Sequence, residues 1–253
     1  MRWLIKLFQL LYCLYAVLLF IALMLIVFPF ALLSTFFGRI NGGNMLYRLV
    51  MVWADIWFPL IGIWHKNIYE EPLRPNTSYV FVTNHTSYLD AALIPKTVRQ
   101  PVRPLGKVEM AKVPFFGYIY KNVIVTVDRS CAKNRAKSVR ILRSVIKKGI
   151  SIFFFPEGTF NETGQPLKSF YDGAFRIAIE TGTPIKPILF LDAYDRLHPN
   201  NILSMTPGKN RAVFLQEIPT ENLTSKDVAT LKQQVYDLMD RKLREYGASH
   251  IKV

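Results

Sequence analysis

Residues 83–90, TNHTSYLD, follow an apolar run at 78–82, SYVFV, that is typical of a buried strand. The chain has only four histidines, and one of them, His85, stands where this strand ends, five positions before Asp90. On one continuous helix, residues five apart lie about 140° apart around the axis, so the two side chains cannot share a helix face. If His85 precedes a helix and Asp90 lies in its first turn, the chain reverses between them and the side chains can converge.

Two interpretations of this stretch stay open. Ser87 followed by Asp90 matches a capping box, in which the hydroxyl and the carboxylate satisfy free backbone N–H groups of the first helical turn. Alternatively, Asp90 holds the His85 ring and fixes its tautomer, so that the other ring nitrogen can accept a proton. An Asn-x-Thr/Ser glycosylation match at Asn84 is treated as chance, because a sugar there would crowd His85.

The elements that follow alternate between strand and helix patterns. We expect helices from about residue 87, over the basic segment before 148, at 173–180 and at 225–246, the last capped by Ser225. We expect strands at 79–83, 123–127, 150–155, 185–191 and 212–215. This order predicts an α/β fold with a mixed, largely parallel sheet flanked by helices.

The N-terminal region is apolar enough to enter a membrane. Residues 8–37 contain no charged side chain, and as a helix they would be about 45 Å long, against roughly 30 Å of bilayer hydrocarbon. A second apolar stretch follows at 45–64. We expect membrane-anchoring helices over 1–64, as a pair that dips into one leaflet and returns, and an α/β domain over 65–253. A single straight span and a hairpin buried in the domain are the alternatives.

The charge of the chain is concentrated in one segment. The net charge is +14, and residues 96–148 contain fourteen Lys or Arg against two acids. Such a patch suits nucleic acid, an anionic membrane surface or a phosphate-bearing substrate. The apolar N-terminal region and the absence of a recognition motif argue against nucleic acid. Cys13 and Cys131 stand in unlike surroundings, so we expect no disulfide framework.

Polar clusters end three of the expected strands. They are residues 84–90, the sequence VDR at 127–129 and the sequence FPEGT at 155–159, while TPIKP at 183–187 begins a fourth strand. In open α/β sheets, functional groups gather at the carboxyl ends of the strands. We therefore expect these clusters to meet.

In this order and spacing, the motifs resemble those of the glycerophosphate acyltransferases, and most closely those of the membrane-bound 1-acyl-sn-glycerol-3-phosphate acyltransferases. The sequence GKVEMAKVPFFG at 106–117 is also similar to that family. The resemblance implies transfer of an acyl chain from acyl-CoA or acyl-carrier protein to the sn-2 hydroxyl of 1-acyl-glycerol-3-phosphate, which forms phosphatidic acid in phospholipid synthesis. It also implies a membrane-bound protein with no cofactor besides the acyl donor. Because the glycosylation match at Asn84 is treated as chance, we expect the catalytic domain to lie on the cytoplasmic face.

The resemblance implies roles for particular residues. His85 would be the base that takes the proton of the acceptor hydroxyl, oriented by Asp90. Arg129 would grip the acceptor phosphate with its planar fork of donors. In the FPEGT motif, Gly158 would let backbone N–H groups approach the phosphate or a developing oxyanion, Thr159 would add a donor, and Glu157 would orient donors or the acceptor hydroxyl.

The sequence departs from the family directly after this motif. The family commonly has arginine where this chain has Phe160. Lys107 and Lys168 are the candidates to supply the missing charge, with an ordinary surface lysine as the alternative for each. The departure leaves open whether the acceptor is lysophosphatidic acid or another lysophospholipid.

Two rival functions start from the same residues. His85, Asp90 and Glu157 could belong to a metal-dependent hydrolase, but the other histidines fall in no metal-spaced cluster, so we expect no metal. A non-catalytic, membrane-anchored lipid-binding protein would need only the charge and the apolar region. Such a protein would be free to lose His85.

Overall fold

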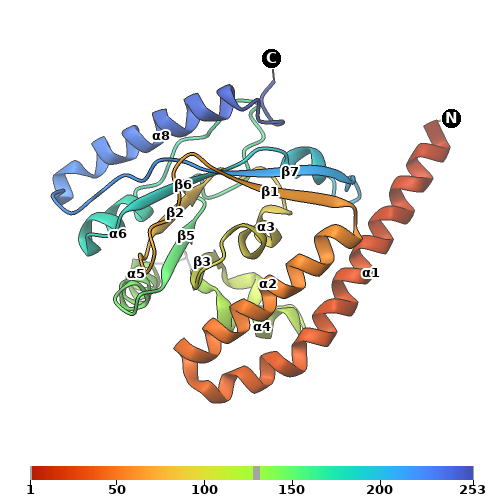
Figure 1. Cartoon of the computed structure of the whole chain (residues 1–253), viewed down its shortest axis with the longest axis horizontal. Coiled ribbons are helices and arrows are strands. Elements are labelled where there is room, and N and C mark those ends of the chain that lie inside the picture. Colours follow the sequence, from red (N-terminus) through yellow and green to blue (C-terminus); the bar gives the residue numbers. More distant parts are fainter. Residues whose placement is uncertain (1, 128–131, 253) are drawn as a thin grey trace.

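The computed structural model describes residues 2–127 and 132–252, in which seven strands form one sheet (Figure 1). The strand order is β1-β7-β6-β2-β5-β3-β4, and every pair is parallel except β6 with β7. The strands are β1 (Ile63–Tyr69), β2 (Val80–Thr83), β3 (Val102–Lys107), β4 (Val125–Val127), β5 (Ser151–Phe154), β6 (Ile185–Phe190) and β7 (Gly208–Phe214). The predicted α/β class with a mixed, largely parallel sheet is confirmed.

Helices cover both faces of the sheet (Figure 1). One face carries α1 (Arg2–Ser34), α2 (Gly43–Leu60), α3 (Asp90–Thr97) and α4 (Phe116–Val123). The other face carries α5 (Ala132–Ile146), α6 (Gly173–Thr181) and α8 (Val228–Glu245). Shorter elements are η1 (Thr35–Phe37), η2 (Gly38–Gly42), η3 (Val108–Lys112), α7 (Ala193–Arg196) and η4 (Ser225–Asp227).

The central strands are apolar on both faces because both faces are covered. Every residue of β2, β5 and β6 is buried. Side chains alternate along each strand, so Phe81 and Phe153 enter the core beneath α2 and α3, while Val80 and Ile152 enter the core beneath α6 and α8. Continuous apolar runs of this kind are typical of covered parallel sheets.

Three local expectations were wrong or incomplete. β1 was not foreseen, since Ile63 and Trp64 were counted with the apolar stretch before them. β3 was also missed, because Arg103, Pro104 and Gly106 interrupt its apolar pattern. The last helix is capped through Thr224 rather than Ser225: Thr224 and Asp227 form the capping box that opens η4.

The N-terminal helices turn back on each other through η1 and η2, and α2 returns beside α1 (Figure 1). The indole of Trp57 donates to the carbonyl of Ala16 at 3.0 Å and the hydroxyl of Tyr12 to the carbonyl of Ile61 at 2.6 Å. The outer face of α1 leaves large apolar side chains exposed, Trp3 and Phe8 among them. By length and composition, the stretch Trp3–Leu60 counts as one candidate membrane span rather than two.

A buried lysine explains part of the TPIKP motif. Lys186 lies early in β6, beside Phe81 of β2, and its side chain is fully buried. Its ammonium lies 2.8 Å from Glu71 Oε2, which also accepts the backbone N–H of Glu217 at 2.6 Å. Glu71 therefore compensates the buried charge of Lys186. This pair lies away from the carboxyl edge of the sheet.

We predict that Glu71→Gln lowers the free energy of unfolding by about 2 kcal/mol, below the roughly 3–5 kcal/mol of a fully buried pair, because Glu71 is partly exposed. Adding Lys186→Met should restore stability, since the double variant contains no uncompensated buried charge. Denaturant unfolding in detergent measures both. An unchanged midpoint for the single variant would contradict the assignment.

Candidate active site

Asn84 fixes the direction of the chain as it leaves β2. Its side chain is fully buried and exchanges two hydrogen bonds with the backbone of Phe190 on the neighbouring strand β6. Asn84 Nδ2 donates to the Phe190 carbonyl at 2.9 Å, and the Phe190 N–H donates to Asn84 Oδ1 at 2.8 Å. Sequence reasoning missed this role. The available signal was a polar residue placed directly after four buried strand residues.

The loop after Asn84 brings His85 and Asp90 together. His85 Nδ1 lies 2.8 Å from Asp90 Oδ2, and the same oxygen accepts the backbone N–H groups of Thr86 and Ser87 at 2.7 and 2.9 Å. Asp90 is the first residue of α3 and is fully buried. The carboxylate therefore orients the His85 ring and also satisfies the Ser87 N–H, as a capping box would.

The Ser87 hydroxyl completes the loop differently from the expected box. It accepts the N–H of Leu89 at 3.0 Å and donates to the carbonyl of Leu197 at 2.6 Å. Ser87 thus ties the loop to the segment after α7.

Glu157 joins the first and third motifs. Its side chain is buried, and its two carboxylate oxygens accept the backbone N–H groups of His85 and Lys168, both at 2.9 Å. Burial raises the pKa of Glu157 to about 8, against the opposing effect of these two N–H donors. Its position agrees with the interpretation that it orients other groups.

The FPEGT loop places Thr159 and Lys168 side by side. Gly158 has a φ of +72°, in the left-handed region that favours glycine, and its N–H donates to the Phe155 carbonyl at 3.0 Å. The turn leaves Thr159 exposed. The Lys168 ammonium donates to Thr159 Oγ1 at 2.6 Å and lies 3.4 Å from the Phe160 carbonyl oxygen.

Aromatic rings surround the imidazole of His85. The ring stacks on Phe155 with a centroid distance of 3.9 Å, and Phe160 meets it edge-on at 4.4 Å. Phe160 in turn contacts Tyr88 at 4.7 Å. About a fifth of the His85 side chain stays exposed, at 19%. The ring is therefore held by packing as well as by Asp90, and sequence reasoning did not foresee that Phe160 touches it.

The structure does not join Lys107 to this cluster. Lys107 ends β3, which is separated from β2 by β5, and its side chain is exposed. Arg129 lies outside the described residues. Within 2–127 and 132–252, no group of three or more His, Cys, Asp or Glu side chains is arranged to hold a metal ion.

Residues 66–191 match a family model described as acyltransferase. The chain is 30% identical over 176 residues to the 1-acyl-sn-glycerol-3-phosphate acyltransferase of Salmonella typhimurium, covering 66% of this chain and 67% of the relative. The chain belongs to the acyltransferase family. This acyltransferase is also 26% identical over 200 residues to the enzyme of the same name from Haemophilus influenzae, covering 78% and 81%.

A solved structure shares the whole architecture. The crystal structure of the 1-acyl-sn-glycerophosphate acyltransferase PlsC from Thermotoga maritima superposes with a TM-score of 0.76 at 22% identity, over 98% of both chains. The shared fold therefore includes the N-terminal helices of this acyltransferase, which precede the segment matched by the family model. The pair His85 and Asp90, called the dyad below, lies inside that segment, as do Glu157 and Lys168.

We predict that the stability of the acyltransferase depends on pH through Glu157. The folded pKa of about 8 is above the ordinary value of 4.5, so the folded state retains a proton that the unfolded chain loses between these values. The contribution of Glu157 to stability is therefore greatest at low pH and falls as pH rises through this window.

Thermal midpoints of the wild type and Glu157→Gln between pH 5 and 9 test this dependence. Glu157→Gln should lower the midpoint at every pH, because Gln can accept only one of the two N–H bonds. The midpoint of the wild type should nevertheless fall relative to that of the variant as pH rises. Parallel curves would show that Glu157 stays ionised throughout.

Proposed function

We propose that this acyltransferase transfers an acyl group from acyl-CoA or acyl-carrier protein to the sn-2 hydroxyl of 1-acyl-glycerol-3-phosphate, forming phosphatidic acid. The observation that carries this proposal is the 2.8 Å contact between His85 Nδ1 and the buried carboxylate of Asp90. The relatives in Salmonella typhimurium and Haemophilus influenzae are 1-acyl-sn-glycerol-3-phosphate acyltransferases, which supports the choice of acceptor.

The dyad suits proton removal from an alcohol. With Nδ1–H donated to Asp90, the lone pair of His85 is on Nε2, which takes the proton of the acceptor hydroxyl as its oxygen attacks the thioester carbonyl carbon. A C–O bond forms and the C–S bond breaks. The proton then passes from Nε2 to the departing thiolate, so the free thiol leaves and His85 returns to its starting state.

The acceptor phosphate would be bound by the loop beside the dyad. The Lys168 ammonium is held against Thr159 on the same loop that brings Phe160 to the His85 ring. This placement favours Lys168 as the cation that replaces the arginine of the family. Arg129, which follows β4, and Lys107 are further candidates for the same phosphate.

Membrane attachment would bring the acceptor to this loop. The exposed apolar face of α1 continues into a groove of about 420 Å³ between α1 and the segment before α4, lined by apolar side chains such as Phe20, Met24 and Phe115. Lys107 and Lys112 are exposed beside this segment and suit an anionic lipid surface. We place the catalytic region on the cytoplasmic face, where acyl-CoA and acyl-carrier protein are available.

We predict that His85→Ala lowers kcat for acyl transfer by roughly 10²- to 10⁴-fold while the protein stays with the membrane fraction. Asp90→Asn should lower kcat more than it raises the acceptor KM, because it disturbs the orientation of the ring. A radiolabelled acyl-transfer assay on lysophosphatidic acid measures both. His198→Gln, which changes a histidine paired with Tyr194, is the matched control. Wild-type turnover of His85→Ala would overturn the mechanism.

We also predict that Lys168→Ala raises the KM for lysophosphatidic acid about tenfold, the effect of one lost charge-assisted hydrogen bond. Lys168→Arg should retain affinity, and Lys209→Ala is the control at an exposed lysine. A wild type that prefers a lysophospholipid with an esterified phosphate by more than tenfold in kcat/KM would instead show that Phe160 marks a different head-group specificity. In that case Phe160→Arg should shift the preference towards lysophosphatidic acid.

A further inference from the structure

Helix α3 connects the candidate active site to the N-terminal helices. Its first residue is Asp90, and its eight residues extend over about 12 Å. The amino end is fixed by the bonds that Asp90 accepts from His85 and from the loop. The position of the carboxylate therefore also depends on what holds the other end of the helix.

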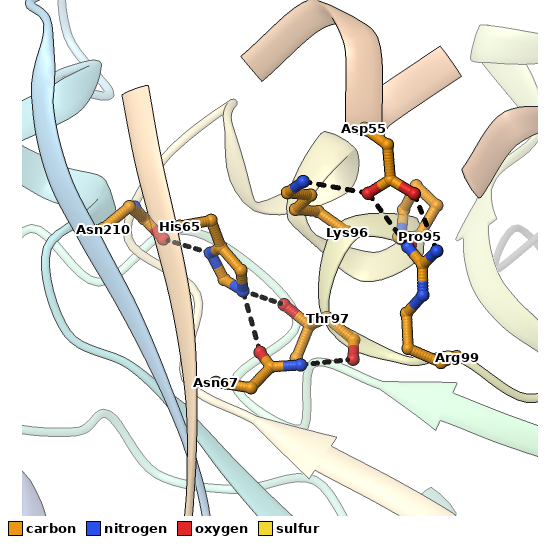
Figure 2. A network of polar contacts seen from close by, with 8 residues as sticks. All are labelled: Asp55, His65, Asn67, Pro95, Lys96, Thr97, Arg99 and Asn210. Atoms are coloured by element: carbon orange, nitrogen blue, oxygen red, sulfur yellow. Dashed lines mark hydrogen bonds and ion pairs between the residues drawn. The ribbon is translucent and has the colours of Figure 1, made fainter. Parts of the chain in front are cut away.

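The carboxyl end of α3 is bound to α2 by an ion-pair cluster (Figure 2). Asp55 of α2 accepts the Lys96 ammonium at 2.8 Å on Oδ1. Its two oxygens also accept the Arg99 guanidinium at 3.1 and 2.7 Å, in the two-pronged geometry that gives arginine–carboxylate pairs their directionality. One carboxylate thus fixes two positions at the end of the helix.

The sequence makes Asp55 conspicuous. It is the only acidic residue among the first 69, in the middle of an apolar helix. A carboxylate in such a segment is costly unless it is paired, and residues of this kind mark functional contacts. Of the two partners that compensate it, Lys96 lies in the last turn of the helix that begins with Asp90, and Arg99 lies two residues beyond the end of that helix.

A second set of contacts holds the same end of α3 to the sheet (Figure 2). Asn67 of β1 donates to the Thr97 carbonyl at 2.9 Å, and its side-chain oxygen lies 2.8 Å from His65 Nε2. His65 Nδ1 lies 3.0 Å from Asn210 Oδ1 on β7. Burial lowers the pKa of His65, against the opposing effect of the contacts with Asn67 and Asn210.

The helix needs these external contacts because its own hydrogen bonding is weak. Pro95 lies inside α3 and removes one backbone donor from a helix of two turns. Side chains of neighbouring elements bind carbonyls at its end: Asn67 of β1 donates to Thr97, and the Tyr47 hydroxyl of α2 donates at 2.9 Å to the carbonyl of Val98, the residue directly after the helix. The orientation of α3 is consequently set by α2 and β1.

We infer that Asp55, through Lys96 and Arg99, is a positioning residue for the His85–Asp90 dyad: it sets the orientation of α3 and so couples the N-terminal helix pair to the base. The expected effect of Asp55 on turnover rests on the proposed function. The expected effect of Asp55 on the geometry of the dyad does not depend on that function, so the positioning role and the proposed function can be tested separately.

Asp55→Asn and Arg99→Gln in the full-length protein in detergent micelles test this coupling, because they change the local charge in opposite directions. Glu217→Gln is the matched control, since Glu217 forms a comparable two-pronged pair with Arg74 on a remote surface. The downfield proton resonance of the His85–Asp90 hydrogen bond, assigned by its loss in His85→Gln, reports dyad geometry without requiring activity. The thermal midpoint, kcat and KM of each variant complete the set.

Positioning predicts the same result for both variants. The resonance should move upfield in each, and kcat should fall about tenfold with KM within twofold, a smaller loss than the roughly hundredfold of a 1 Å misplacement. Arg99→Gln retains the Lys96–Asp55 pair, so it tests the coupling even if Asp55→Asn does not fold. The control should change neither the resonance nor kcat.

Other outcomes would overturn the inference. Opposite shifts of the resonance would indicate a through-space charge effect, and a lower thermal midpoint with unchanged resonance and kcat would indicate a purely structural role. If the wild type transferred no acyl group to lysophosphatidic acid, the proposed function would fail, while the resonance would still decide whether Asp55 positions the dyad.

Discussion

The buried carboxylate of Asp90 is the constraint on which the site depends. A carboxylate without solvent must be compensated by hydrogen-bond donors, and one oxygen of Asp90 accepts three, from the His85 ring and from the Thr86 and Ser87 backbones. These bonds require the loop between β2 and α3 to fold back over the helix end. The bonds that Asp90 accepts at the start of α3 therefore also orient the imidazole of His85. Capping of the helix and orientation of the ring are one arrangement rather than alternatives.

Glu157 extends this arrangement to the third motif. It binds the His85 N–H and the Lys168 N–H with separate oxygens, so the loop after β5 is held in register with the loop after β2. Phe155 and Phe160, on either side of Glu157, pack on the His85 ring and exclude water from most of it. The proposed general base and the proposed phosphate-binding loop are thus held together by the side chain of Glu157 and by two aromatic rings.

The N-terminal helices are part of the same packing unit. Side chains of α1 and α2 share a continuous apolar core with one face of the central strands, and α3 lies between α2 and the sheet edge. An enzyme that acts on a membrane lipid needs its catalytic groups at a defined depth. Packing of α2 against α3 would provide such a reference, whereas a flexible tether would not.

The sequence by itself determined the features that depend on neighbouring residues. The apolar run before residue 83 predicted β2, the spacing of His85 and Asp90 predicted their convergence across a helix start, and the ordered motifs identified the family. Tertiary structure decided contacts between distant segments: Glu157 reaches His85 across 72 positions and Asn84 reaches Phe190 across 106. It also decided that Lys186 is buried and paired with the partly exposed Glu71, and that β1 and β3 are strands despite interrupted apolar patterns. The physical reason is that local sequence fixes backbone preference and periodicity, whereas the partner of a polar side chain depends on which strands become neighbours in the sheet.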